Sequence, residues 1–175
     1  MDWIFHILIA VIAGILIVTF IAQITVVNGS SMFPTLQNGN ILLTEKISQR
    51  FGAIHRGDIV TLYVPEFLEE GKSVIIKRVI GVAGDTVEVK DGKVFVNGKQ
   101  LTEKYINGNY TEQYKGDPSH DYNKVTVQKG YIYVLGDNRL PNASKDSRII
   151  GPVPLSKLRG KAFFRIYPFN KIGSV

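Results

Sequence analysis

The chain has 175 residues, of which 45% are hydrophobic and 21% are charged, an ordinary composition for a globular protein. It contains no cysteine, which excludes disulfides, thiolate zinc sites and cysteine nucleophiles. The formal net charge of +6 suits an anionic membrane surface. The basic residues are scattered and match no nucleic-acid-binding motif, so we expect no nucleic-acid partner.

The N-terminus is a long apolar run. Residues 3–27 contain no Asp, Glu, Lys or Arg, and Trp3–Ala22 alone supplies the roughly 20 apolar residues that a helix needs to cross a bilayer. A cleaved secretory signal normally has a basic start and a shorter apolar stretch. We therefore predict a retained transmembrane anchor over residues 1–27, with the lipid bilayer as a partner, followed by one domain over residues 28–175.

The domain after the anchor is predicted to be mainly β. Short stretches rich in Val, Ile, Leu and Tyr alternate with Gly and Asp turns, a pattern typical of strands. The dipeptides Asp91-Gly92 and Asn97-Gly98 predict tight turns. The expected strands are Asn40–Thr44, Asp58–Val64, Ser73–Val82, Thr86–Val89, Val94–Val96, Val125–Val127, Tyr131–Leu135 and a closing strand within Gly160–Pro168.

Other segments carry weaker signals. Glu45–Phe51 could form a short helix and Leu155–Leu158 a helical turn, while β-branched residues at 24–27 favour a change from helix to strand. Residues 99–124 are polar and have few aliphatic side chains, so we expect a loop-rich excursion and not a second domain. The aromatic residues near the end of the chain (Phe163, Phe164, Tyr167 and Phe169) are expected to fill the core and not to touch lipid.

A serine and a lysine are the best candidates for chemistry. Ser31 lies just beyond the apolar run, after Gly29, which lets the backbone approach a substrate closely. Lys77 lies within an apolar stretch, where burial would lower the pKa of its amine. A neutral amine could take the proton from a serine hydroxyl. The alternatives are an ordinary polar turn at Ser31 and an edge-strand lysine whose amine reaches water.

No other group of residues forms a recognisable site. The stretch from Gly136 to Arg139 is typical of a surface turn. No loop has the spacing of a calcium or zinc site, so we expect no metal and no cofactor. His55 and His120 lack recognisable partners for a Ser-His-Asp triad.

Four strings together resemble the bacterial type I signal peptidases, which are membrane-bound serine/lysine proteases, and the resemblance covers nearly the whole chain. The strings are Gly29-Ser30-Ser31-Met32-Phe33-Pro34-Thr35-Leu36; Arg56-Gly57-Asp58-Ile59-Val60 with Pro65; Ile76-Lys77-Arg78-Val79-Ile80-Gly81 through Gly84-Asp85; and Gly136-Asp137-Asn138-Arg139 through Ser144, Asp146-Ser147-Arg148 and Gly151. The single anchor and the small excursion resemble the Gram-positive form. The resemblance implies a signal-peptidase-like β body of antiparallel sheets behind one transmembrane helix.

The resemblance also assigns roles within the site. It implies Ser31 as nucleophile, Lys77 as general base and Ser144 as the serine that hydrogen-bonds the lysine amine. The segment between Arg139 and Asp146 is longer than is common in the family. We therefore count back from the Asp-Ser-Arg string, and this selects Ser144 as the matching serine. The Ser31 N–H would supply part of the oxyanion hole. Gly29 replaces a helping hydroxyl that one branch of the family has, so that contribution is expected to be missing.

The implied substrates are secretory preproteins, cut after a small-x-small sequence. Met32, Leu36 and Ile76 match the pocket for the residue before the cut, and Val27 matches a wall two residues further back. A structural role around the site is expected for the remaining motif residues, which are Gly29, Arg78, Asp137, Asn138, Arg139, Asp146 and Arg148.

We expect a monomer whose catalytic domain lies outside the cytoplasm, although charge alone leans weakly the other way. Two alternatives stay open: a catalytically inactive membrane-anchored binding module, and a self-cleaving repressor-like Ser/Lys protease.

Overall fold

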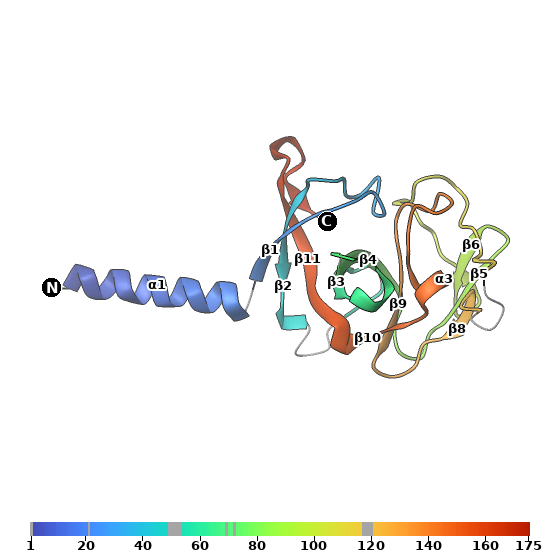
Figure 1. The fold of residues 1–175 in the computed structure, drawn as a ribbon, viewed down its shortest axis with the longest axis horizontal. Coiled ribbons are helices and arrows are strands. Elements are labelled where there is room, and N and C mark those ends of the chain that lie inside the picture. Colours follow the sequence, from blue (N-terminus) through green and yellow to red (C-terminus); the bar gives the residue numbers. More distant parts are fainter. Residues whose placement is uncertain (1, 21, 49–53, 69, 72, 117–120) are drawn as a thin grey trace.

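The computed structural model describes residues 2–20, 22–48, 54–68, 70–71, 73–116 and 121–175, and combines one N-terminal helix with a β body (Figure 1). The helices are α1 (Asp2–Phe20) and α3 (Ser147–Ile150), with single 3-10 turns η1 (Pro65–Phe67), η3 (Leu155–Lys157) and η4 (Phe169–Lys171). The strands are β1 (Ala22–Val26), β2 (Ile41–Glu45), β3 (Ile59–Tyr63), β4 (Val74–Gly81), β5 (Thr86–Lys90), β6 (Lys93–Val96), β7 (Lys99–Gln100), β8 (Lys124–Thr126), β9 (Tyr131–Leu135), β10 (Val153–Pro154), β11 (Leu158–Tyr167) and β12 (Gly173–Ser174).

The strands form two antiparallel sheets, which confirms the mainly β prediction. The larger sheet has the order β1-β2-β11-β3-β4-β9-β10, with β12 added to β11, and the smaller sheet has the order β7-β6-β5-β8. Asp91 and Asn97 have positive φ, as their predicted tight turns require. Of the predicted helix Glu45–Phe51, residues 49–51 lie outside the described residues, and Glu45 is the last residue of strand β2.

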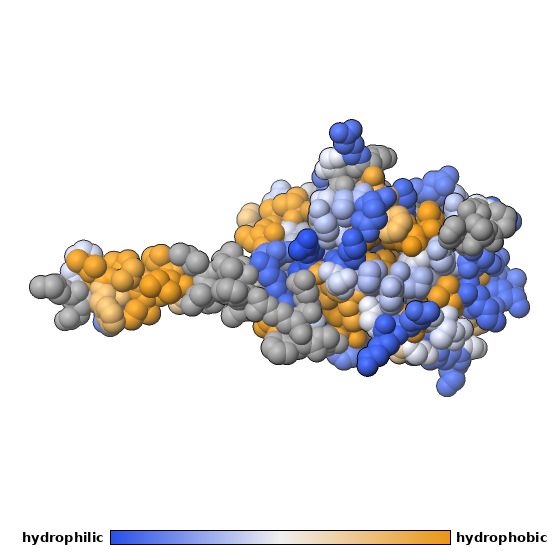
Figure 2. Space-filling model, turned by 60° about the horizontal axis from the view of Figure 1, so that its bottom comes forward, coloured by the Kyte–Doolittle hydropathy of each residue, from blue (hydrophilic) through white to orange (hydrophobic). Residues whose placement is uncertain are grey.

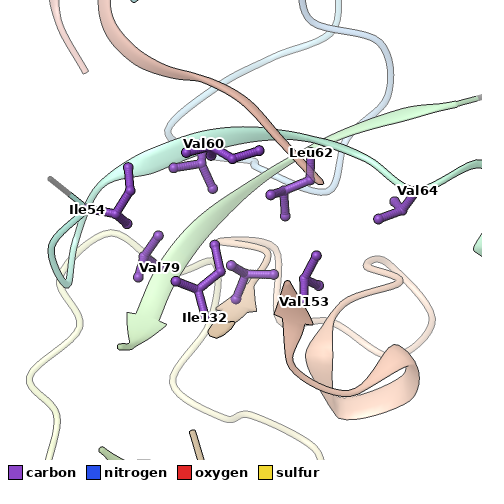
Figure 3. Packing of buried hydrophobic residues seen from close by; sticks show 9 residues of the cluster. Ile54, Val60, Leu62, Val64, Val79, Ile132 and Val153 are labelled. Atoms are coloured by element: carbon purple, nitrogen blue, oxygen red, sulfur yellow. The ribbon is translucent and has the colours of Figure 1, made fainter. Parts of the chain in front are cut away.

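Strand β9 joins the two halves of the core because its side chains alternate between them. Ile132 and Val134 pack in a cluster with residues of β3, β4, β10 and β11, and Figure 3 shows this cluster from close by. Tyr133 and Leu135 pack in a second cluster against valines of the smaller sheet. With both faces covered, β9 fixes the chain that follows it, beginning at Gly136.

Helix α1 extends away from the β body (Figure 1), and the parts of it that can be described carry apolar side chains (Figure 2). The apolar run does not continue as one helix, because the chain is already in strand β1 from Ala22. Among the described residues, no helix is long and apolar enough to cross a membrane. The predicted transmembrane anchor is therefore not confirmed, whereas the predicted change from helix to strand is.

Three of the four aromatic residues near the end of the chain depart from the prediction that they fill the core, whereas Phe164 is half-buried. Phe163 and Tyr167 are exposed, and Phe169 is 78% exposed. Strand β11 alternates its side chains, and Ala162, not its aromatic neighbour, takes the buried position. The Tyr167 and Phe169 rings instead pack edge to face on each other, with 5.5 Å between their centroids.

Candidate active site

Ser31 lies in the turn that follows β1. Gly29 has a φ of +104°, a backbone conformation that glycine adopts readily, and its N–H donates to Asn38 Oδ1 at 2.9 Å. Asn138 holds the turn from the other side: its N–H donates to Ser31 O at 3.0 Å and its side-chain amide to Ser30 O at 3.1 Å. Both the carbonyl of Ser31 and that of its neighbour are therefore fixed by one residue of the 136–139 stretch.

Lys77 lies on β4 and is only 2% exposed. Its Nζ donates to Ser31 Oγ at 2.7 Å and to the Ile76 carbonyl at 3.0 Å. The strand alternation places it on the same face as Ile75 and Val79, which belong to or pack against the first core cluster. The structure thus brings together the two side chains that carry the sequence-based hypothesis.

Burial sets the charge state of this amine. It lowers the pKa of Lys77 to about 8, although the negative charges of Asp146 and Asp137 oppose the shift. Arg148 acts in the same direction as burial. A substantial fraction of the amine is therefore neutral in mildly alkaline solution and could accept a proton from the hydroxyl that it contacts.

Ser144 is placed close to the Ser31 turn, but its hydroxyl makes no hydrogen bond to the Lys77 amine. Ser144 Oγ is buried without a well-formed hydrogen bond in the described structure, although it lies near enough to Asp146 to help lower the pKa of that carboxyl. A Cβ at Gly136 would lie 2.3 Å from Ser144 Oγ and 2.4 Å from Ser31 O. The absence of a side chain at Gly136 therefore lets these two serines approach each other.

Three buried arginines support the surrounding backbone. Arg78 forms a two-point contact with Asp137, with distances of 2.9 and 2.7 Å, and Arg148 forms one with Asp146, both distances being 2.9 Å. Arg139 binds the carboxylate of Glu103 at 3.0 and 2.5 Å. We call these three pairs the charged layer. The sequence indicated its arginines and aspartates, whereas no sequence signal pointed to Glu103.

Thr35 is a further residue that sequence reasoning missed. Its hydroxyl donates to Asp137 Oδ2 at 2.5 Å. Because Thr35 is in the same turn as Ser31, this bond ties the turn to the charged layer. The position of Thr35 inside the recognised string, four residues after Ser31, was the available signal.

A cleft of about 910 Å³ runs past Ser31 and Lys77. One wall is β1, which pairs only with β2 among the described strands, and the other is the start of β4. Strand β9 pairs with β4 only from Arg78 onward. Both walls therefore present strand edges that no described strand occupies, so an extended chain could add between them.

The floor of the cleft beside Ser31 is apolar. Val27, Met32, Leu36 and Ile76 belong to one buried cluster. Three of them line the cleft, whereas Leu36, which was predicted to line the pocket, is fully buried and does not. The described residues contain no group of three or more His, Asp or Glu side chains that could hold a metal ion.

Comparison with known proteins identifies the family. Residues 1–167 match the family model described as signal peptidase, peptidase S26. The chain is 42% identical to a probable signal peptidase I-2 of Synechocystis sp., over 94% of this chain and 72% of that protein. It is 38% identical to signal peptidase I T of Bacillus subtilis, over 98% of this chain and 88% of that protein. A crystal structure of a signal peptidase I from Enterococcus faecalis matches with a TM-score of 0.49 and 32% identity, covering 62% of this chain and 95% of that one. The chain belongs to the signal peptidase family, peptidase S26.

Proposed function

We propose that this protein is a serine endopeptidase that removes signal peptides from secretory preproteins, with Ser31 as nucleophile and Lys77 as general base. The observation that carries the proposal is the hydrogen bond of 2.7 Å between the buried amine and the hydroxyl. The neutral amine takes the hydroxyl proton as Ser31 Oγ attacks the scissile carbonyl, and water later releases the acyl group from Ser31. Among the described residues the Ser31 N–H donates no hydrogen bond, which leaves it available to the oxyanion.

The substrate binds as an extended strand between β1 and the start of β4. Main-chain hydrogen bonds to the two strand edges hold it without regard to sequence, and pockets for alternate side chains supply the selectivity. The apolar floor formed by Val27, Met32 and Ile76 favours small side chains at the residue before the cut and two residues further back. This arrangement supports cleavage after small-x-small sequences.

The alternatives from the sequence are less well supported. An inactive binding module has no need of a buried amine within hydrogen-bonding distance of a hydroxyl, because burying a lysine costs free energy. A self-cleaving repressor is less well supported because the family model and the relatives reported above are signal peptidases. The proposed enzyme acts as a monomer and without a cofactor.

The decisive experiment measures cleavage of a purified preprotein in detergent. We expect Ser31→Ala and Lys77→Ala each to lower kcat by at least about 10³-fold, because each removes half of the reacting pair. Ser156→Ala and Lys99→Ala, which change exposed residues outside the lining of the cleft, serve as matched controls and should cleave at the wild-type rate. Full activity of purified Lys77→Ala would refute the assignment of the base.

The dependence of rate on pH tests the same pair independently. Because the base must be neutral, kcat/KM should rise about tenfold per pH unit below the pKa of Lys77 and level off above it. Because burial lowers the pKa of Lys77 to about 8, the rate should level off near pH 8. A rate that is flat between about pH 6 and pH 9 would exclude a lysine base with this pKa.

We also propose that helix α1 holds the protein at the membrane as a single-pass anchor, with the body on the extracytoplasmic side; residues 22–27 of the predicted anchor belong instead to β1 and the cleft. The uncharged run from Trp3 to Ala22 supports this assignment. The chain has no native cysteine, so Lys99→Cys introduces one exposed thiol in the body. A membrane-impermeant maleimide should label this thiol on intact cells. The protein should also stay in the membrane fraction after extraction with alkaline carbonate. Labelling only after lysis would place the body in the cytoplasm.

A further inference from the structure

The excursion at residues 99–124 contacts every arginine of the charged layer. Glu103 binds Arg139, whose side chain also donates to Thr111 Oγ1 at 2.8 Å. Arg148 donates to the Glu112 carbonyl at 2.9 Å. The Arg78 guanidinium lies over the Tyr105 ring, 4.1 Å from its centroid. One segment of the chain therefore reaches all three arginines, although its sequence indicated only a polar loop.

Glu103 and Tyr105 form the buried part of this contact. The Arg139 side chain is 0% exposed and the Glu103 side chain 6% exposed, so each group depends on the other for its charge partner. Tyr105 donates its hydroxyl to Glu103 Oε1 at 2.9 Å. Burial and the adjacent Glu103 carboxylate both raise the pKa of Tyr105, so the hydroxyl keeps its proton as a donor.

The backbone of the same segment lies between the two loops that shape the active site. Ile106 forms a β-bridge with Pro34, in the Ser31 turn. The Asn107 N–H donates to the Asp137 carbonyl at 3.0 Å, and a second bridge joins Asn107 to Asn138. Asn138 itself holds the Ser31 carbonyl. Residues 103–107 therefore contact both the Ser31 turn and the 136–139 stretch.

We propose that Tyr105 and Glu103 are positioning residues for the cleavage reaction, an inference that rests on the proposed function. The Tyr105 ring covers one face of the Arg78 guanidinium and holds it in the orientation that clasps Asp137. Asp137 in turn accepts the Thr35 hydroxyl and so fixes the Ser31 turn. Neither residue lines the cleft, so the contact acts on the geometry of attack and leaves substrate binding unchanged.

The test compares Tyr105→Leu with Tyr105→Phe in the full-length protein, using preprotein cleavage in detergent. Tyr105→Leu removes the aromatic face, and we expect kcat to fall about tenfold while KM stays within about twofold of wild type. Tyr105→Phe keeps the face but loses the hydroxyl that bonds Glu103, so its kcat should fall only about threefold. Tyr110→Leu, in the same excursion but packed over Gly92, is the matched control and should leave kcat unchanged.

The outcomes separate this inference from the proposed function. An unchanged kcat in Tyr105→Leu, or an equal loss in Tyr105→Phe, overturns the positioning role, as does a loss that appears only in KM. If Tyr105→Leu does not fold, Glu103→Asp keeps the charge opposite Arg139 while withdrawing it from the Tyr105 hydroxyl. A fall in kcat of at least about threefold in Glu103→Asp, with KM unchanged, supports the proposal, and no fall overturns it. A wild-type protein that cuts no preprotein would instead refute the proposed function.

Discussion

The cleft and the charged layer differ in how their buried basic groups are partnered. In the cleft, the Lys77 amine bonds a hydroxyl and a carbonyl, and no Asp or Glu is found among the described lining residues. In the charged layer each arginine faces a buried carboxylate. A buried amine without a carboxylate partner gives up its proton easily, whereas paired guanidinium groups keep their charge and fix the backbone between them.

Asp146 shows how the charged layer keeps its ionised state. Burial would raise the pKa of this carboxyl, but the hydrogen bonds and positive charge of Arg148 outweigh burial and lower it. The ionised Asp146 and Asp137 then act on Lys77 from a distance and limit how far burial lowers its pKa. The two regions are therefore linked: the layer that holds the loops also affects the pKa of the Lys77 amine.

The largest effect is expected from removing one charge of the layer. Asp137→Asn leaves the Arg78 guanidinium buried without its carboxylate, which should lower the free energy of unfolding by about 3–5 kcal/mol. Glu88→Gln is the matched control, because Glu88 pairs with Lys124 where the lysine side chain is 66% exposed. It should change stability by less than about 0.5 kcal/mol. Urea unfolding measures both, and equal effects would show that the layer is not a distinct region.

A smaller effect is expected where the cleft meets the layer. Gly136→Ala would put a Cβ 2.4 Å from Ser31 O and 2.3 Å from Ser144 Oγ, so both serines, or the backbone at residue 136, must move. Because a displacement of about 1 Å can cost about 100-fold in rate, we expect a loss of that order in kcat. Circular dichroism should show a folded protein. Wild-type kcat in this variant would mean that the Ser31 turn shifts without consequence.

The sequence predicted more of the cleft than of the charged layer. Ser31 and Lys77 lie in strings with a recognisable order, and the aliphatic neighbours of Lys77 indicated its burial. The partner of Arg139 could not be foreseen in the same way. Glu103 lies in a polar segment without periodicity, and only the folding of the excursion back onto the loops of the candidate site brings it to the arginine.

Local patterns also explain which parts of the fold were predicted well. Asp91-Gly92 fixes its hairpin through backbone conformation alone, and the alternation in β9 follows from two buried faces. The aromatic residues of β11 were misjudged because hydrophobicity does not say which side of a strand faces the core. Phe163 is exposed because the adjacent Ala162 takes the inward position.

Replacing Lys77, the proposed base, should stabilise the protein while abolishing activity. A protonated amine is costly in this site: lowering the pKa from 10.5 to about 8 corresponds to about 3 kcal/mol, less about 1 kcal/mol for lost hydrogen bonds in Lys77→Met. We expect a gain of about 2 kcal/mol near pH 7.

The sign of the pH dependence checks this interpretation. Between about pH 8 and pH 10.5 the unfolded chain still binds the proton that the folded protein has released, so wild-type stability rises with pH and the advantage of Lys77→Met disappears. Thermal melts at neutral and alkaline pH measure this trend. An advantage that grows with pH would show that the amine is not destabilised by burial.

The smallest effects distinguish two serines that lie three residues apart, Ser144 in a loop and Ser147 at the start of α3. Ser144 Oγ is buried without a well-formed hydrogen bond, whereas Ser147 Oγ accepts the Val134 N–H at 2.9 Å. Ser144→Ala should therefore raise the free energy of unfolding by about 1 kcal/mol, and Ser147→Ala should lower it by a similar amount, because only the second removes a partner from a buried N–H. Chemical unfolding of both variants gives the two signs.

Activity of the same Ser144 variant shows whether the cleft depends on its hydroxyl. Since the Lys77 amine bonds Ser31 and Ile76 and not Ser144, we expect kcat in Ser144→Ala to fall by no more than about tenfold, the value of one modest hydrogen bond. A loss as deep as that of Ser31→Ala, together with the expected gain in stability, would show that the Ser144 hydroxyl turns to the amine or the substrate during turnover. The absence of a partner for this hydroxyl would then be a property of the resting enzyme, and the family assignment of Ser144 would hold for the reacting one.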